Sequence, residues 1–180
     1  KRRQHRRRHL ADADLDRVLS DFQAAVREGI ARAEALNDGM PPTYFMYHAE
    51  AYELLPDQEH VRVTRFKPEV LPLFLEGPVR ALKIMDDPVA ARALHDRIKA
   101  SPLYDGALGM YKVNASLAEM PLDIGRARAF TPGWLENESI WLHMEYKYLL
   151  ALLDAGLVDA FYDDFRRALI PFQNPAIYGR

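Results

Sequence analysis

Apolar residues recur at spacings of three and four along much of this sequence, which is the period of an amphipathic α-helix. The first apolar stripe runs from Leu15 to Leu36, and Asn37-Asp38-Gly39 then favours a helix end. The same pattern predicts further helices over residues 43–55, 69–76, 78–86, 88–100, 137–154 and 157–170. The fold class expected from the pattern is therefore mainly α.

The last two predicted helices are separated only by Ala155-Gly156, which implies an αα-hairpin. Two other ranges depart from the helical period. Residues 60–66 alternate between apolar and polar positions and favour a short strand or an extended loop. Residues 103–134 are rich in glycine and proline, and such a long irregular stretch is usually functional or poorly ordered.

Composition places the chain among globular proteins. Of its 180 residues, 49% are apolar and 28% are charged, and this length can bury one substantial core. The lack of cysteine excludes disulfides and thiolate chemistry, although it leaves the redox compartment undetermined. No apolar run approaches the roughly 18 residues of a membrane span, so we expect no membrane partner and a cytoplasmic protein.

The charge is unevenly distributed. Residues 1–10 carry six basic side chains and no acidic one, which leaves 18 basic against 26 acidic residues over 11–180. We expect residues 1–10 to form a mobile basic arm before a single helical domain over 11–180. The arm could bind nucleic acid or anionic lipid phosphates, but the acidic remainder argues against a nucleic-acid partner.

The segment 133–148 offers the best candidate chemistry. On a helix, Glu138, Trp141 and Glu145 share one side, with the cations His143 and Lys147 one turn apart beside them. A sugar suits such a surface, since an indole stacks on a pyranose and carboxylates accept its hydroxyl protons. His143 and Lys147 could hold an anion such as phosphate.

A purely structural interpretation of the same residues stays open. The two glutamates could be ordinary surface acids, Trp141 a core residue and His143 a partly exposed histidine. His143 has no second ligand at metal spacing, so no metal site is predicted. The sequence contains no phosphate-binding loop, dinucleotide fingerprint or serine nucleophile motif.

The run Glu136-Asn137-Glu138-Ser139-Ile140-Trp141-Leu142-His143 resembles the later helices of cellobiose-phosphorylase-like proteins. Members carry E-N-G-x-x-F-x-H, then a helix and a hairpin turn. The likeness extends over residues 103–180, through Ala155-Gly156-Leu157, Leu169-Ile170-Pro171-Phe172 and Tyr178-Gly179-Arg180. Glu136, Asn137 and His143 match that pattern, whereas Glu138 and Ser139 replace small residues and Trp141 replaces the usual phenylalanine.

The resemblance implies an (α/α)6 toroid, of which this chain would supply helical hairpins amounting to about half. It implies a glycoside phosphorylase or hydrolase acting on a small carbohydrate, with inorganic phosphate as co-substrate and no other cofactor. Sugar would contact Trp134, Glu136, Glu138 and Trp141, and His143 would bind phosphate. The family's catalytic aspartate motif and its threonine-glycine phosphate loop are absent from these residues, so the catalytic residue is not assigned.

A half ring would leave apolar side chains without partners. Because the chain also begins at Lys1 rather than at methionine, we expect a fragment of a larger toroid that associates with the rest of its polypeptide or forms a homo-oligomer. The alternative function is a non-catalytic helical protein-interaction module. Binding of nucleic acid through residues 1–10 is a third, weaker hypothesis.

Overall fold

A computed structural model describes residues 12–178 of the chain, and the side chains of residues 14–176. The basic arm expected over residues 1–10 lies outside this range. The elements, in chain order, are α1 (Asp12–Ala35), β1 (Phe45–Leu54), β2 (Val61–Val70), α2 (Glu76–Leu82), α3 (Pro88–Lys99), β3 (Tyr104–Asp105), β4 (Met110–Tyr111), the 3-10 turns η1 (Leu122–Ile124) and η2 (Arg126–Ala129), α4 (Leu142–Asp154), α5 (Val158–Ala168), η3 (Ile170–Phe172) and α6 (Pro175–Tyr178).

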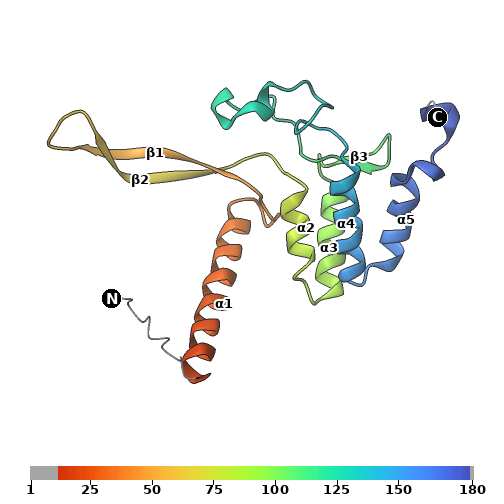
Figure 1. The fold of residues 1–180 in the computed structure, drawn as a ribbon, viewed down its shortest axis with the longest axis horizontal. Coiled ribbons are helices and arrows are strands. Elements are labelled where there is room, and N and C mark those ends of the chain that lie inside the picture. Colours follow the sequence, from red (N-terminus) through yellow and green to blue (C-terminus); the bar gives the residue numbers. More distant parts are fainter. Residues whose placement is uncertain (1–11, 179–180) are drawn as a thin grey trace, which may run out of the picture.

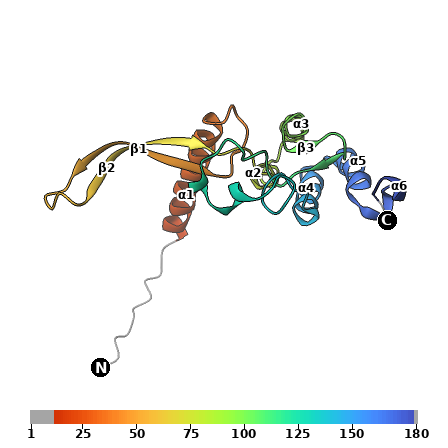
Figure 2. The same ribbon diagram turned by 90° about the horizontal axis from the view of Figure 1, so that it is seen from above.

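Two parts project from a helical body, which we define as residues 71–178. Figure 1 shows α2, α3, α4 and α5 grouped together, whereas α1 and the β1–β2 hairpin extend away from them in different directions. Seen from above, the hairpin and α5 lie toward opposite ends of an elongated molecule (Figure 2). The core of the described residues therefore belongs to the body.

The core forms where α2, α3, α4 and α5 meet. Its buried apolar side chains include Leu75, Val79, Leu82, Ala91, Leu94, Ile98, Leu103, Tyr111, Tyr148, Leu149, Leu152, Leu157, Ala160 and Ala168. Leu94 and Ile98 are one turn apart on α3, as the sequence pattern requires for a single buried face. Val89, in the first turn of α3, points outward instead.

Local sequence signals place the ends of the body helices. The carboxylate of Asp87 caps α3 by accepting a hydrogen bond of 2.9 Å from the backbone N–H of Val89, and Pro88 fits the first turn. Gly156 has a φ of 77° between α4 and α5, a conformation that favours glycine. The expected αα-hairpin at Ala155-Gly156 is thereby confirmed.

The helix predicted over 43–55 is wrong. This segment contains β1, which pairs antiparallel with β2 from Phe45 opposite Val70 to Leu54 opposite Val61. The carboxylate of Asp57 stabilises the turn by accepting the backbone N–H groups of Glu59 and His60, each at 3.1 Å. Of the two alternatives expected over 60–66, a short strand or an extended loop, the structure shows a strand, β2, which runs from Val61 to Val70.

The hairpin has one charged and one apolar face. Glu53 pairs with Arg62 and His48 with Glu69 across the strands, each at 2.6 Å. The register places apolar residues opposite one another on the other face, which comprises Phe45, Tyr47, Tyr52, Leu54, Val61, Val63, Phe66 and Val70. Most of these side chains are exposed.

The mainly α toroid of helical hairpins is contradicted by this architecture. The described residues form a mixed α/β structure with two antiparallel two-stranded sheets, one of them the ten-residue pair β1–β2. The physical reason is the pairing of β1 with β2 across a short turn, because the spacing of apolar residues within one segment does not show that it pairs with the next. Within residues 12–178, no helix has both the length and the apolar character to cross a bilayer.

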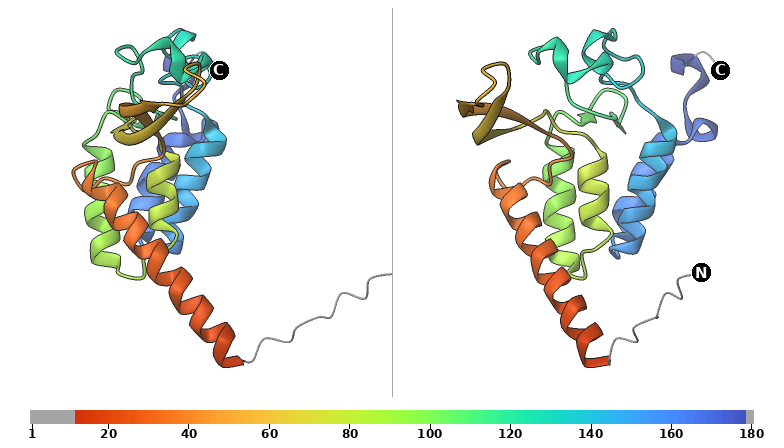
Figure 3. Two further views of the ribbon diagram at one scale, coloured as in Figure 1. Left: turned by 90° about the vertical axis from the view of Figure 1, so that its left-hand side faces the viewer. Right: turned by 60° about the vertical axis from the view of Figure 1, so that its left-hand side comes forward.

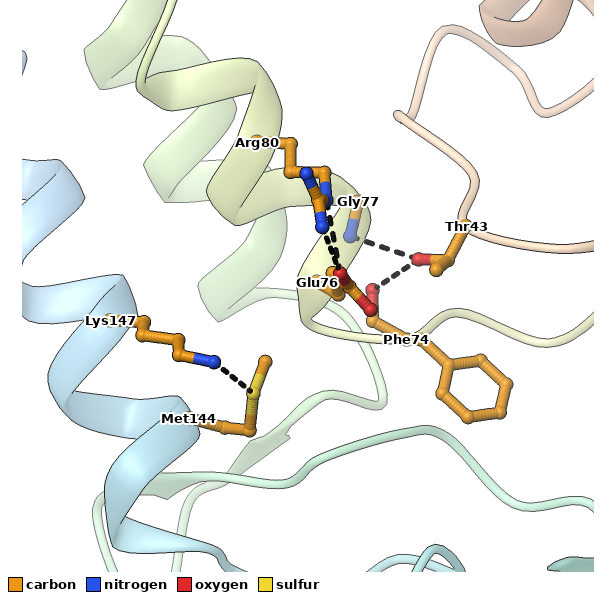
Figure 4. A network of polar contacts seen from close by, with 7 residues as sticks. All are labelled: Thr43, Phe74, Glu76, Gly77, Arg80, Met144 and Lys147. Atoms are coloured by element: carbon orange, nitrogen blue, oxygen red, sulfur yellow. Dashed lines mark hydrogen bonds and ion pairs between the residues drawn. The ribbon is translucent and has the colours of Figure 1, made fainter.

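A small polar junction joins the projecting parts to the body (Figure 4). Thr43 Oγ1 donates to the carbonyl of Phe74 at 3.2 Å and accepts the backbone N–H of Gly77 at 2.9 Å. Gly77 is the second residue of α2 and Thr43 lies two residues before β1, so the junction fixes the start of the hairpin against the first turn of α2.

Candidate functional site

The predicted sugar-binding residues lie in or beside one closed loop, which we call the tryptophan loop (residues 130–141). A β-bridge joins Trp134 and Asn137, and the backbone N–H of Gly133 donates to the carbonyl of Asn137 at 2.7 Å. The buried side chain of Asn137 donates through Nδ2 to the carbonyl of Phe130, also at 2.7 Å. These bonds hold the loop in one conformation.

The loop contains two left-handed residues that are not glycine. Leu135 has a φ of 48° and Glu138 a φ of 57°. Each such residue costs roughly 1–2 kcal/mol, and strain of this kind clusters at functional sites. The hydroxyl of Ser139 donates to the carbonyl of Leu135 and supports the first of these positions.

Trp134 presents an indole that is 58% exposed at the tip of the loop. The ring of Phe130 meets it edge to face, with the centroids 5.3 Å apart. Two residues later, Oε1 of Glu136 lies 3.4 Å from Arg126 Nη2, whereas Oε2 is enclosed and has no hydrogen-bond partner among the described residues. The tip therefore combines an open aromatic face with a partly exposed carboxylate that lies beside an arginine.

Glu138 is held from two sides. Its carboxylate pairs with Lys112 at 3.1 Å, and each of these side chains is about one-fifth exposed. The backbone N–H of Glu138 donates to Asn114 Oδ1 at 3.0 Å, and Asn114 is fully buried. This arrangement orients Glu138 and gives its charge a partner.

Trp141 and His143 lie side by side where the loop enters α4. Their rings are 5.3 Å apart with an angle of 35° between the planes. Trp141 is half-buried, whereas His143 and Lys147 are exposed, one turn apart on α4. Because His143 lies in the first turn, the positive end of the helix dipole and its unshared N–H groups add to the attraction for an anion there.

The structure corrects the predicted helix over 137–154, because α4 begins only at Leu142. Glu138, which is left-handed, and Trp141, which is extended, therefore precede the helix and do not share one helix side with Glu145. The inward face also differs. The spacing of Leu142, Tyr146, Leu149 and Leu153 favours a core face made of these four residues. Of the four, only Leu149 is fully enclosed, whereas Tyr146 is 43% exposed.

The inward side of α4 instead takes part in a buried polar network that also involves β4, α3 and α5. The backbone N–H of Tyr111 in β4 donates to Glu145 Oε1 at 3.0 Å, and the Tyr111 hydroxyl donates to Asp164 of α5 at 2.8 Å. Lys99 of α3 forms an ion pair with Asp164, also at 2.8 Å. Burial raises the pKa of Tyr111, so the phenol remains a hydrogen-bond donor.

The same network contains a second pair, His95 of α3 and Tyr148 of α4, joined by a hydrogen bond of 2.7 Å at His95 Nδ1. Burial lowers the pKa of His95, which favours the neutral imidazole, and burial raises the pKa of Tyr148. The network thus joins β4 to α3, α4 and α5, and its position at the centre of the body indicates a structural role.

Glu145 is the most perturbed carboxyl group of the described residues. Burial raises its pKa to about 7, the hydrogen bond from Tyr111 opposes that shift, and the charge of Asp164 adds to it. A pKa near neutrality is typical of a general acid. Glu145 is nevertheless fully buried, so it does not reach the tryptophan loop surface as a proton donor.

A cleft of about 580 Å³ lies beside the site but is lined by other residues. It is bounded by Leu108, Met110, Ile140, Leu142, Ile170 and Gln173, among others. Its lining includes neither Trp141 nor His143, so these two rings do not open onto this cleft.

The sequence analysis missed the roles of Tyr111, Asp164 and His95, because each belongs to a different element and only the fold brings them together. Within the described part of the chain, no three His, Asp or Glu side chains gather as metal ligands. Comparison of the chain with protein-family models, curated proteins and solved structures gives no match. The geometry of the tryptophan loop is therefore the basis for inferring a function.

Proposed function

We propose that the tryptophan loop binds a carbohydrate and that His143 holds inorganic phosphate, in a cytoplasmic enzyme of the glycoside phosphorylase type. The observation that carries this proposal is the exposed indole of Trp134, in the same closed turn as the partly exposed carboxylate of Glu136. An aromatic platform with an adjacent carboxylate acceptor is the chemistry that a sugar ring with its hydroxyl groups requires.

Each residue of the loop has a distinct part in this proposal. Trp134 stacks on the apolar face of the sugar, and Glu136 and Glu138 accept hydroxyl protons. Trp141 extends the aromatic surface toward α4. His143 donates to a phosphate oxygen, with Lys147 one turn further along adding positive charge.

In phosphorolysis, a phosphate oxygen forms a bond to the anomeric carbon while the bond to the glycosidic oxygen breaks. The leaving oxygen takes a proton from a carboxylic acid, as in inverting glycosidases, where water attacks instead. We assign no residue as that acid. Glu145 has a suitable pKa but is enclosed, and Glu136 lies beside Arg126.

Tryptophan fluorescence tests the proposal directly, because the chain has only two tryptophans and both are in the tryptophan loop. We expect cellobiose or another glucose disaccharide to shift the emission of the wild-type chain. Trp134→Phe should abolish most of this shift, and Trp141→Phe should retain it. No shift with any glucose disaccharide at tens of millimolar would contradict carbohydrate binding.

Two further substitutions separate the roles of the loop residues. Glu136→Gln should weaken saccharide binding about tenfold, the loss of one charge-assisted hydrogen bond. Glu28→Gln is the matched control, since Glu28 is also exposed beside an arginine, 3.6 Å from Arg32. His143→Ala should abolish phosphate binding measured by calorimetry, whereas His60→Ala in the hairpin turn should leave it unchanged.

The products distinguish the reaction types. Incubation with a disaccharide and phosphate should release a sugar 1-phosphate, whereas a hydrolase would release free sugars with or without phosphate. If the protein binds saccharide but releases neither product, it is a carbohydrate-binding protein, and the proposed enzymatic activity is rejected.

The apolar face of the β1–β2 hairpin supports a second candidate, a protein-interaction module. An isolated two-stranded hairpin is marginally stable in water, and Tyr47 and Phe66 expose their rings on this face with the centroids 6.4 Å apart. For this function, Phe66→Lys should abolish partner binding while Trp134→Phe leaves it intact. If Trp134→Phe abolished binding and Phe66→Lys left it intact, the result would favour the carbohydrate-binding function.

A further inference from the structure

Helix α1 carries a continuous apolar seam. Its members follow spacings of 4, 3, 4, 3, 4 and 3, the heptad pattern of a helix that packs along another helix. We call these residues the α1 seam, and they are Leu15, Leu19, Phe22, Val26, Gly29, Ala33 and Leu36.

Most of this seam has no cover within the described residues. Phe22 is 66% exposed and Val26 is 60% exposed, and α1 makes few contacts with any other element. Figure 3 shows α1 running away from the body, with only its C-terminal end close to α2 and α3. A helix of 24 residues gains little stability on its own, so the seam requires a partner.

The order of side-chain sizes along the seam selects the partner. Large residues occupy its N-terminal half, and small residues occupy much of its C-terminal half. When a second α1 lies antiparallel, Leu15 faces Ala33, Leu19 faces Gly29, and Phe22 faces Val26. Each of these three layers then combines a larger residue with a smaller one, and Leu36 lies beyond them.

A parallel pair would not pack as well. Phe22 would face Phe22 of the second copy, and Gly29 would face Gly29, so one layer would be crowded and another would be empty. Crowding and cavities each destabilise a packed helix pair. The parallel arrangement would also bring both helical bodies to the same end.

We propose that the α1 seam binds the α1 seam of a second copy of this chain, antiparallel and around a twofold axis near residue 24. Because α1 joins the body at its C-terminal end (Figure 3), this arrangement places the two bodies at opposite ends of the helix pair. The contact is isologous and closes as a dimer.

A cleft at the C-terminal end of the seam fits the same arrangement. It measures about 370 Å³ and is lined by Ile30 of α1, Ala81 of α2, Ile84 just after α2, and Pro41 and Pro42 between the two helices. In the antiparallel pair, Leu15 and Leu19 of the second copy lie at this end. Leu15 of the second copy then packs beside Ala33 and extends the apolar contact toward the cleft.

The available area is sufficient for a specific dimer. Large apolar side chains measure roughly 150–200 Å² when fully exposed, and Leu15, Leu19, Phe22, Val26 and Leu36 are each about half or more exposed. With Val18 and Ile30 the stripe offers roughly 600 Å² per copy. Two copies would bury roughly 1,200 Å², the lower limit for stable interfaces.

Light scattering after size-exclusion chromatography tests the association. We expect twice the chain mass of 20.7 kDa at micromolar concentration. Phe22→Glu and Val26→Glu should each shift the protein to monomer with an unchanged near-ultraviolet spectrum, since the body core does not include either residue. Ala24→Glu, on the opposite side of α1, is the matched control and should remain a dimer.

Crosslinking tests the orientation, because the chain has no native cysteine. Leu15→Cys and Ala33→Cys are purified separately, then mixed and oxidised. The antiparallel pair predicts a disulfide between the two different variants, whereas a parallel pair predicts disulfides only within each variant. A monomeric wild type, a dimer insensitive to Val26→Glu, or same-variant crosslinks alone would overturn the proposal.

Discussion

The backbone N–H of Gly77 lies 2.9 Å from the hydroxyl oxygen of Thr43, and this hydrogen bond joins residues that are 34 positions apart. No side chain larger than hydrogen fits at position 77. A Cβ atom there would lie 2.7 Å from the carbonyl oxygen of Pro41 and 2.8 Å from that of Pro42. The close approach fixes the direction in which the chain leaves α1 and enters the β1–β2 hairpin.

Gly77→Ala is therefore expected to destabilise the protein. Alanine favours a helix by about 1 kcal/mol over glycine, but the clash with two backbone oxygens and the Thr43 hydroxyl costs about 3 kcal/mol. The net loss should be about 2 kcal/mol, measured as the free energy of unfolding in urea.

Gly106→Ala provides the control, because a Cβ at position 106 has no atom within 4 Å. This change should be neutral or stabilising by about 0.4–1 kcal/mol, through the entropy of the unfolded chain. Equal losses at the two positions would show that the contact at Gly77 is not the cause.

A second prediction concerns the buried carboxylate of Asp164. Lys99→Met removes its cation and leaves a negative charge inside the body, so we expect a loss of about 3–5 kcal/mol. Tyr111→Phe removes one hydrogen bond to the same carboxylate and should cost about 1–3 kcal/mol.

Lys112→Met is the comparison for Lys99→Met, since Lys112 also pairs with an acid, Glu138, at 3.1 Å. Both members of that pair contact solvent, so the expected loss is about 1 kcal/mol or less. Chemical unfolding of the three variants should rank Lys99→Met as the most destabilised. A loss for Lys112→Met as large as that for Lys99→Met would contradict the argument from burial.

Local sequence signals predicted the parts of the fold that local interactions determine. The cap at Asp87, the proline after it and the glycine between α4 and α5 each act within a few residues. They located α3 and the α4–α5 hairpin to within a few residues. The apolar spacing over residues 15–36 likewise predicted α1. It could not show that most of these apolar side chains are exposed, with no other element of the described residues packed against them.

A helix was the wrong prediction for residues 43–55, where residues such as Glu50 and Leu54 favour a helix by their own preference. The pairing with β2 decides their conformation, and a bulge near Ala51 interrupts the two-residue alternation that would have indicated a strand. Glu145 was expected to lie at the surface, either beside a bound sugar or as an ordinary surface acid. Tyr148 and Leu152, which lie on the same side of the helix as Glu145, are buried. Their spacing from Glu145 could have indicated that Glu145 is buried too.

For the candidate site, the sequence indicated the correct segment but not its geometry. Trp134, Glu136 and Glu138 do lie in one loop, and the rings of Trp141 and His143 are adjacent. The extended backbone from Ser139 to Trp141 was not foreseen, because it depends on Val113, whose backbone N–H donates to the Ser139 carbonyl at 2.7 Å. That contact comes from the irregular stretch of the sequence.

The pH dependence of stability should reveal Glu145. Its pKa is about 7 in the folded protein against 4.5 for an ordinary glutamate. Between these values the folded state keeps the proton and the unfolded state releases it, so the free energy of unfolding falls as the pH rises from about 4.5 to 7 and is level above that range. The shift corresponds to a loss on the order of 3 kcal/mol.

Glu145→Gln removes this titration and keeps an oxygen for the N–H of Tyr111. The variant should match the wild type near pH 5 and exceed it by up to about 3 kcal/mol at pH 8. The difference between the two proteins isolates Glu145, because His95 titrates in both. Urea unfolding at several pH values measures this difference, and a constant difference from pH 5 to 8 would show that Glu145 is ionised in the folded protein throughout.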